Sequence, residues 1–209
     1  FLEHAAGGEG VRRDDDRIRI GYVSADFREH AVGFLLPPFL QAHAGDKYEL
    51  YAYDYTREEN TPLRGKFKGL FSQFRSIAQL SDRQAAELIL SDEIDILIDL
   101  QGLTSGARPD ILSWRPARHQ VTYLGFPATT ALPAIDWVIA DRFVMPEALQ
   151  PYMTEKPLYL PRCYQASDRK RPVGKMPCRA DYQLPDDAFV YCSFNNNFKF
   201  TPEDRKSVV

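Results

Sequence analysis

Four short segments of the sequence combine side chains that could do chemistry with residue types typical of loops. The first, residues 24–30 (SADFREH), places two acidic side chains and the imidazole of His30 directly after an apolar run. Imidazole titrates near pH ~6.5, so His30 could act as a general base or orient a substrate hydroxyl. A helix-capping loop with a solvated histidine would have the same sequence, and both interpretations stay open.

Two further segments are rich in glycine and hydroxyl groups. Residues 101–108 (QGLTSGAR) follow the most apolar run of the chain, and their backbone N–H groups could closely approach a sugar or a phosphate. Residues 123–130 (YLGFPATT) mix aromatic, glycine, proline and hydroxyl side chains and could line an acceptor groove. Tight structural turns would explain both segments equally well.

The fourth segment, residues 195–199 (NNNFK), ends on Lys199. A lysine beyond the end of a strand could neutralise a diphosphate leaving group, and this kind of electrostatic stabilisation is valuable in a water-poor cleft. The three asparagines supply hydrogen-bond donors and acceptors. A solvated turn is the alternative interpretation.

The elements that would position these segments alternate in type. Pro37 and Pro38 are expected to break or restart the first helix, and Gln84 completes a capping box with Ser81 at the start of the third. Strands separated by helices predict an α/β fold with a Rossmann-like, doubly wound, mostly parallel sheet. In such sheets, ligands bind beyond the carboxyl ends of the strands. The predicted strands are 17–24, 48–55, 74–77, 94–100, 119–124 and 135–140, and the predicted helices are 32–43, 63–71 and a third beginning after Ser81.

The sequence changes character at three points. Residues 1–16 are small and then strongly charged, which is typical of a linker. The α/β pattern runs over residues 17–160, and residues 161–185 are irregular and indicate a connector. A new strand predicted at residues 188–194 indicates that residues 186–209 begin a second α/β lobe.

Composition excludes several classes of protein. The chain of 209 residues carries 26 Lys and Arg against 29 Asp and Glu, a net charge of −3, which argues against a nucleic-acid binder. No apolar run approaches the ~20 residues of a membrane-spanning helix. Cys163, Cys178 and Cys192 form no CxxC pair, so we expect no metal site and free thiols in a reducing cytoplasm.

Taken in order, these segments resemble the catalytic region of the O-GlcNAc transferase/SPINDLY family, glycosyltransferase family 41. Residues 19–27 with His30 resemble the start of that region, and residues 99–108 resemble its second signature. Residues 115–130, continued by residues 136–141 and 155–161, resemble the third, and residues 190–199 resemble the fourth. The resemblance runs from about residue 17 to residue 202, and the ordered set is far more specific than any one motif.

The resemblance implies the N-terminal lobe of a GT-B glycosyltransferase, an enzyme with two Rossmann-like lobes and a cleft between them. Members transfer N-acetylglucosamine, or fucose in some branches, from a nucleotide sugar to Ser/Thr hydroxyls of proteins, with inversion and generally without a metal. The implied donor is UDP-GlcNAc, with no further cofactor. By matching position, His30 lies near the reacting sugar and acceptor, Lys199 stabilises the leaving diphosphate, and Asn196 contacts the donor. Residues at the cleft edge are Gly102, Thr104, Pro127 and Thr129.

Some features depart from the family pattern. Ala31 stands where the family often has proline, and no tetratricopeptide-type repeat is found. The resemblance also implies a second lobe of well over a hundred residues after Lys199, whereas the sequence ends at Val209. We therefore expect a fragment that contains the acceptor-side lobe and only the first strand of the donor-side lobe, whose own activity is open. The expected partners are a protein acceptor, a UDP-sugar, the second lobe and an upstream repeat domain, with no nucleic acid and no membrane.

Two alternative functions that do not involve catalysis also stay open. The first is a non-catalytic remnant of the lobe that binds a protein or peptide. The second is an unrelated Rossmann-like domain that binds a nucleotide, against which the missing GxGxxG fingerprint counts.

Overall fold

A computed structural model of the protein describes residues 17–43, 45, 47–56, 61–168, 170 and 172–194. The chain divides into two units, the first ending at residue 169 and the second beginning at Lys170. Among the described residues, none of the helices is long and apolar enough to cross a membrane.

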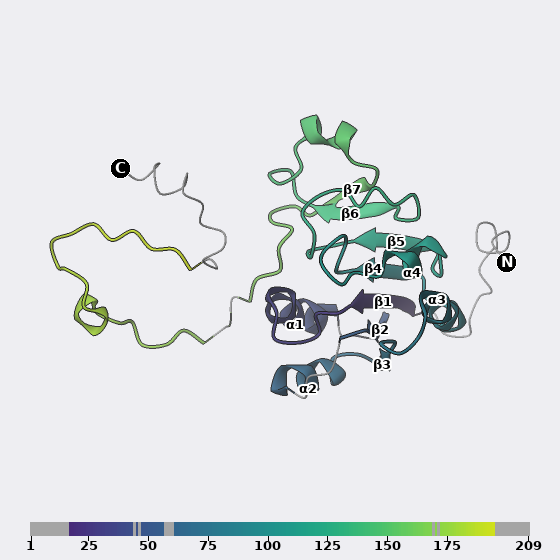
Figure 1. Ribbon diagram of the computed structural model, residues 1–209, viewed down its shortest axis with the longest axis horizontal. Helices are drawn as coiled ribbons and strands as arrows, with labels where there is room; N and C mark the ends of the chain where they lie inside the picture. The colour runs from purple at the N-terminus through teal and green to yellow at the C-terminus, as the bar shows by residue number, and fades with distance from the viewer. Residues whose placement is uncertain are drawn as a thin grey trace. The chain divides into compact units, whose positions relative to one another are not determined.

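The first unit is built on a seven-stranded sheet (Figure 1). Every neighbouring pair of strands is parallel, in the order β3-β2-β1-β4-β5-β6-β7. All carboxyl ends therefore meet at one edge, and the strand order reverses between β1 and β4, where doubly wound sheets bind their ligands. The strands are β1 (Ile18–Ser24), β2 (Tyr48–Asp54), β3 (Gln73–Ser76), β4 (Ile96–Asp99), β5 (His119–Thr122), β6 (Trp137–Ala140) and β7 (Lys156–Tyr159).

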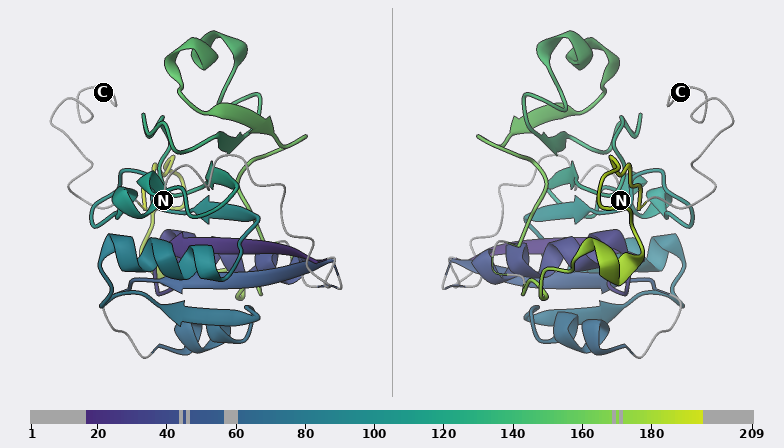
Figure 2. Two further views of the ribbon diagram at one scale, coloured as in Figure 1. Left: turned by 90° about the vertical axis from the view of Figure 1, so that its right-hand side faces the viewer. Right: turned by 90° about the vertical axis from the view of Figure 1, so that its left-hand side faces the viewer.

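Helices cover both faces of this sheet. Helices α1 (Ala31–His43) and α2 (Pro62–Lys68) pack into one apolar core with β1, β2, β4 and β5. Helices α3 (Asp82–Ser91) and α4 (Pro109–Ser113) share a second core with the opposite face. Figures 1 and 2 show α1 and α3 on opposite sides of the stacked strands. A 3-10 helix, η1 (Glu147–Tyr152), follows β6. The predicted doubly wound parallel sheet is confirmed.

Helix α1 continues through Pro37 and Pro38, so the predicted break is wrong. An internal proline costs a helix about 3 kcal/mol, because it removes a hydrogen bond and crowds the carbonyl four residues earlier. Here the apolar face of the helix is buried against the sheet through Val32, Leu36 and Leu40. Burial of side chains of this size contributes about 1.5–3 kcal/mol each, so the three together are comparable with the cost of the two prolines.

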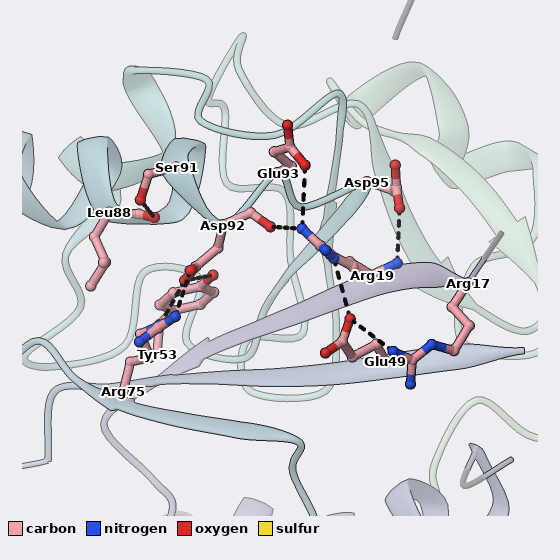
Figure 3. Close-up of polar contacts among 10 residues, drawn as sticks. All are labelled: Arg17, Arg19, Glu49, Tyr53, Arg75, Leu88, Ser91, Asp92, Glu93 and Asp95. Atoms are coloured by element: carbon pink, nitrogen blue, oxygen red, sulfur yellow. Dashed lines mark hydrogen bonds and ion pairs between the residues drawn. The ribbon is translucent and has the colours of Figure 1, made fainter. Parts of the chain in front are cut away.

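Polar side chains at the amino edge of the sheet form a separate network (Figure 3). The Arg19 backbone N–H donates to Asp95 Oδ2 at 2.8 Å, and its guanidinium donates to the Asp92 carbonyl and to Glu49 Oε2. The Asp92 carboxylate in turn accepts two hydrogen bonds from Arg75. This network joins the end of α3 to β1, β2 and β3 through bonds within the protein, so it supports the fold.

In the second unit, the strand predicted at residues 188–194 is wrong. The described residues of this unit contain one 3-10 helix, η2 (Arg179–Tyr182), and no strand. Phe189, Tyr191 and Phe194 are 80%, 78% and 98% exposed. An alternating sequence becomes a stable strand only when it is paired, and none of the described strands pairs with it.

Candidate functional site

His30 begins helix α1 at the carboxyl edge of the sheet. Its carbonyl accepts the Phe34 N–H at 2.9 Å, so His30 is the residue from which the helix starts. Its imidazole Nδ1 lies 3.2 Å from Asp26 Oδ2, and the His30 side chain is 42% exposed while that of Asp26 is 7% exposed. The loop therefore presents an imidazole to solvent with a buried carboxylate behind it.

Gly33 allows the His30 segment to fold back against the first turn of α1. A Cβ atom at this position would lie 2.0 Å from the Arg28 carbonyl oxygen and 2.9 Å from that of Asp26. Both are backbone atoms and cannot rotate away. Sequence analysis missed Gly33; a glycine in the first turn of an otherwise apolar helix was the available signal.

Hydrogen bonds join the second predicted segment to the end of β1. Ser24 Oγ donates to Gln101 Oε1 at 3.2 Å, and Gln101 Nε2 donates to Thr104 Oγ1 at 3.3 Å. Thr104 Oγ1 also donates to the Gln101 carbonyl at 2.9 Å. The structure thus brings Thr104 into the same network as the loop that carries His30.

Gly102 occupies the tight turn that directly follows β4. Its φ of 54° lies in the left-handed region, and a Cβ atom there would lie 2.4 Å from Phe126 Cβ. Asp99 Oδ1 and Oδ2 accept the backbone N–H groups of Gln101 at 3.0 Å and Gly102 at 2.8 Å. Gly102 is therefore required by the turn and by its contact with the third segment, and it lies buried below the surface that a ligand would reach.

Burial raises the pKa of Asp99 to about 6, although the N–H groups of Gln101 and Gly102 act in the opposite direction. An unfolded chain releases the Asp proton near the ordinary pKa of about 3.9. Between these two values the folded protein holds more protons than the unfolded chain, so stability falls as pH rises.

We expect this loss of stability to be visible as a pH-dependent difference between wild type and Asp99→Asn. The stability that protonated Asp99 contributes should be complete below about pH 4 and lost as pH rises through about 6, a change of about 3 kcal/mol in the free energy of unfolding. Urea denaturation of both proteins from pH 4 to pH 7 measures it. A wild-type-minus-variant difference that stays constant over this range would refute the buried-carboxyl account.

Thr129 anchors the third segment to the start of β7. Its Oγ1 donates to Glu155 Oε2 at 2.7 Å and accepts the Thr154 N–H at 3.3 Å, while the Thr130 N–H donates to Glu155 Oε1 at 2.7 Å. Burial alone would raise the pKa of Glu155, but the hydrogen bonds from Thr130 and Thr129 outweigh it and lower that pKa. Within the described residues, the side chain of Thr129 bonds to Ala131 and to the two residues before β7, not to the His30 network, and Pro127 is exposed nearby.

A pocket of about 640 Å³ opens at the carboxyl edge beside the His30 loop. Two of the predicted segments contribute to it, through Ala25 and Arg28 and through Ser105, Gly106 and Arg108. Sequence analysis missed Tyr55, Ala78 and Leu80, which follow β2 and β3 and complete the lining. Burial raises the pKa of the Tyr55 hydroxyl, which therefore stays neutral.

Arg108 holds one wall of this pocket in place. Its Nε donates to Asp82 Oδ1 at 2.6 Å, and its two terminal nitrogens donate to the carbonyls of Ile77 at 2.8 Å and Leu80 at 2.6 Å. This set of bonds ties the segment after β4 to the segment after β3. The Arg108 guanidinium therefore makes most of its hydrogen bonds within the protein and holds these two segments together.

Two predicted site residues, Asn196 and Lys199, lie outside the described residues. Among the residues that are described, no group of three or more His, Cys, Asp and Glu side chains is arranged to hold a metal ion. The carboxyl edge of the sheet thus carries an exposed imidazole, a buried carboxylate and a mixed polar and apolar pocket, built from the loops that follow β1, β2, β3 and β4.

Ligands of doubly wound sheets bind at the carboxyl edge where the strand order reverses, and the His30 loop and residues 101–108 follow the two strands at that point. Residues 6–176 match the sequence profile of glycosyl transferase family 41. The chain belongs to this family.

Similar proteins carry names that agree with the family. The chain is 37% identical over 194 residues to a probable UDP-N-acetylglucosamine–peptide N-acetylglucosaminyltransferase SEC from Arabidopsis thaliana, covering 90% of this chain and 20% of the relative. It is 34% identical over 157 residues to a UDP-N-acetylglucosamine–peptide N-acetylglucosaminyltransferase from Caenorhabditis elegans, covering 75% of this chain and 14% of the relative. The chain thus spans about a fifth or less of these relatives.

A solved structure supports the same fold. The K341M mutant of the Thermobaculum terrenum O-GlcNAc transferase superposes with a TM-score of 0.70 and 32% sequence identity, over 78% of this chain and 32% of that one.

Proposed function

We propose that this chain supplies the acceptor-side lobe of an inverting protein O-GlcNAc transferase, which moves N-acetylglucosamine from UDP-GlcNAc onto Ser/Thr hydroxyls of proteins. The observation that carries the proposal is the position of His30: an exposed imidazole at the carboxyl edge of a family 41 sheet, beside a pocket. The names of the relatives support this donor and a peptide acceptor.

In the proposed reaction, His30 Nε2 faces the acceptor hydroxyl. The acceptor oxygen forms a bond to the anomeric carbon as the bond from that carbon to the UDP diphosphate breaks, and the hydroxyl proton passes to Nε2. Attack from the side opposite the leaving group inverts the anomeric centre. A fixed imidazole also positions the hydroxyl, and positioning of this kind accounts for a large part of such rate enhancements.

The pocket beside His30 suits acceptor side chains that flank the modified residue. It is lined by the apolar residues Ala25, Ala78 and Leu80 and by polar residues that include Ser105, Arg28 and Arg108. In this proposal Lys199 neutralises the leaving diphosphate and Asn196 contacts the donor, as the family resemblance implies. A second lobe and an upstream repeat domain complete the proposed partners.

We further propose that the reaction needs no metal or other cofactor and takes place in the cytoplasm. The free thiols of Cys163, Cys178 and Cys192 are consistent with a reducing compartment.

The direct test is a transfer assay on the complete natural polypeptide that carries this sequence. Incubated with UDP-GlcNAc and Ser/Thr-containing peptides, it should add one N-acetylglucosamine per modified hydroxyl, with the anomeric centre inverted and with the rate unchanged by EDTA. GDP-fucose as the alternative donor should give little product. Peptide binding without transfer from any nucleotide sugar would instead support a non-catalytic binding module.

A further inference from the structure

His30 Nδ1 lies between two groups that require opposite protonation states. Asp26 Oδ2 is 3.2 Å away and can only accept a hydrogen bond when ionised, so Nδ1 must carry the proton to bond it. The Val32 N–H points at the same nitrogen from 3.4 Å and requires Nδ1 to be unprotonated. A neutral imidazole can satisfy one of these two groups at a time, and the choice decides whether Nε2 is an acceptor or a donor.

Charge favours a proton on Nδ1, because the Asp26 carboxylate lies at ion-pair distance from it, 3.2 Å. A hydrogen bond to an ionised carboxylate is roughly twice as strong as one between neutral groups. The hydrogen bond from the Val32 N–H is longer, at 3.4 Å, and joins two neutral groups. The charge of Asp26 therefore favours the tautomer with the proton on Nδ1 and the lone pair on Nε2.

Asp26 itself is held firmly in this position. Its backbone N–H donates to Ser24 Oγ at 2.9 Å, and Ser24 Oγ donates to Gln101 Oε1 at 3.2 Å. The second carboxylate oxygen of Asp26 lies 3.4 Å from Arg28 Nε. The backbone at Asp26 is thus tied to the loop after β4 through Ser24, while the carboxylate itself lies beside Arg28 and is nearly inaccessible to water.

The Asp26 carboxylate also stabilises the imidazolium ion that forms when His30 accepts the proton. The start of a helix carries a partial positive charge, which disfavours an imidazolium ion at its first residue. The negative charge of Asp26 opposes this effect at close range. The same residue can therefore select the tautomer before transfer and stabilise the charged imidazole after it.

We propose that Asp26 is a positioning residue that holds His30 in the Nδ1–H tautomer, so that the lone pair of Nε2 is directed at the acceptor hydroxyl. The catalytic part of this inference rests on the proposed function. The tautomer of His30 is a property of the resting protein and can be measured without any reaction.

Long-range proton–nitrogen NMR of the side-chain imidazoles of the 209-residue chain provides the first measurement. At about pH 8.5, where imidazole in water is neutral, wild-type His30 should show a protonated Nδ1 and an unprotonated Nε2. In Asp26→Asn, which keeps the size of the side chain and removes its charge, Nε2–H should become the major form. The matched control is Glu29→Gln, which removes an exposed carboxylate from the same loop and should leave the wild-type pattern.

A wild-type His30 protonated on Nε2 would overturn the proposal, as would an equal change in Asp26→Asn and Glu29→Gln. If Asp26→Asn does not fold, the wild-type spectrum decides on its own.

Kinetics of the complete natural polypeptide provide the second measurement. Asp26→Asn should lower kcat by about 10- to 100-fold while KM for the acceptor peptide changes less than threefold, and Asp26→Glu should restore part of the loss. A rise in KM at unchanged kcat would contradict a role through His30. If wild type transfers no sugar at all, the proposed function fails, whereas the tautomer result still stands or falls separately.

Discussion

Replacing His30 by alanine is expected to lower kcat of the complete natural polypeptide by about 10²- to 10⁴-fold, the usual contribution of a positioned general base. KM for the acceptor peptide should change little, because the imidazole acts on one proton in the transition state and most peptide contacts would lie in the neighbouring pocket. Initial rates with UDP-GlcNAc and a peptide, over a range of peptide concentrations, separate the two constants.

His119 provides the matched control for this variant. It is an exposed histidine at the first position of β5, so it lies at the amino edge of the parallel sheet, opposite His30. His119→Ala should leave kcat within about twofold, as expected of a surface substitution remote from the site. Equal losses in the two variants, or a His30→Ala enzyme with normal kcat, would remove His30 from the chemistry.

Gly33→Ala is expected to destabilise the protein by about 3 kcal/mol, the upper part of the range for overpacking. The added methyl group would lie 2.0 Å from the Arg28 carbonyl oxygen, so either the helix or the loop that carries His30 must move. A displacement of about 1 Å at a reacting group can cost ~10² in rate, and we expect kcat to fall by that factor. Urea denaturation and initial rates measure the two effects.

Gly65→Ala tests whether the lower stability expected for Gly33→Ala comes from the close contact with the Arg28 carbonyl or from replacing any helical glycine by alanine. Gly65 also lies inside a helix, α2, but a Cβ atom there meets nothing within 4 Å. Alanine favours a helix over glycine by about 0.5–1 kcal/mol, so this variant should be slightly more stable than wild type. If Gly33→Ala were equally stabilising, the close packing of the His30 loop on α1 would be wrong.

The sheet could be predicted from the sequence because its strands alternate with helices and carry β-branched and aromatic residues. The run at residues 94–100 and the capping box at Ser81 and Gln84 gave clear local signals, and both appear in the structure. Strand β7 was missed because its four residues, Lys156–Tyr159, include a proline and show no strong pattern. Its place at the sheet edge is set by pairing with β6, which is a tertiary effect.

The loops that form the site could be identified from the sequence, but the roles of most residues within them could not. Segment 24–30 was identified by its residue types, whereas the contact between Asp26 and His30 depends on the fold of a non-helical loop and on Gly33. Thr129 illustrates the opposite case: its hydroxyl suggests a ligand, yet it holds a turn to Glu155, some 26 positions away in the chain. Such partners are brought together only by the completed sheet.

The central claim is that His30 Nε2 faces the acceptor hydroxyl at the carboxyl edge of the sheet. A crystal structure of the complete natural polypeptide with UDP and an acceptor peptide measures this distance directly. The proposal predicts a separation of about 2.6–3.2 Å between Nε2 and the Ser or Thr oxygen, or one bridging water between them. A peptide bound with its hydroxyl at another edge of the sheet, or facing away from His30, would contradict it.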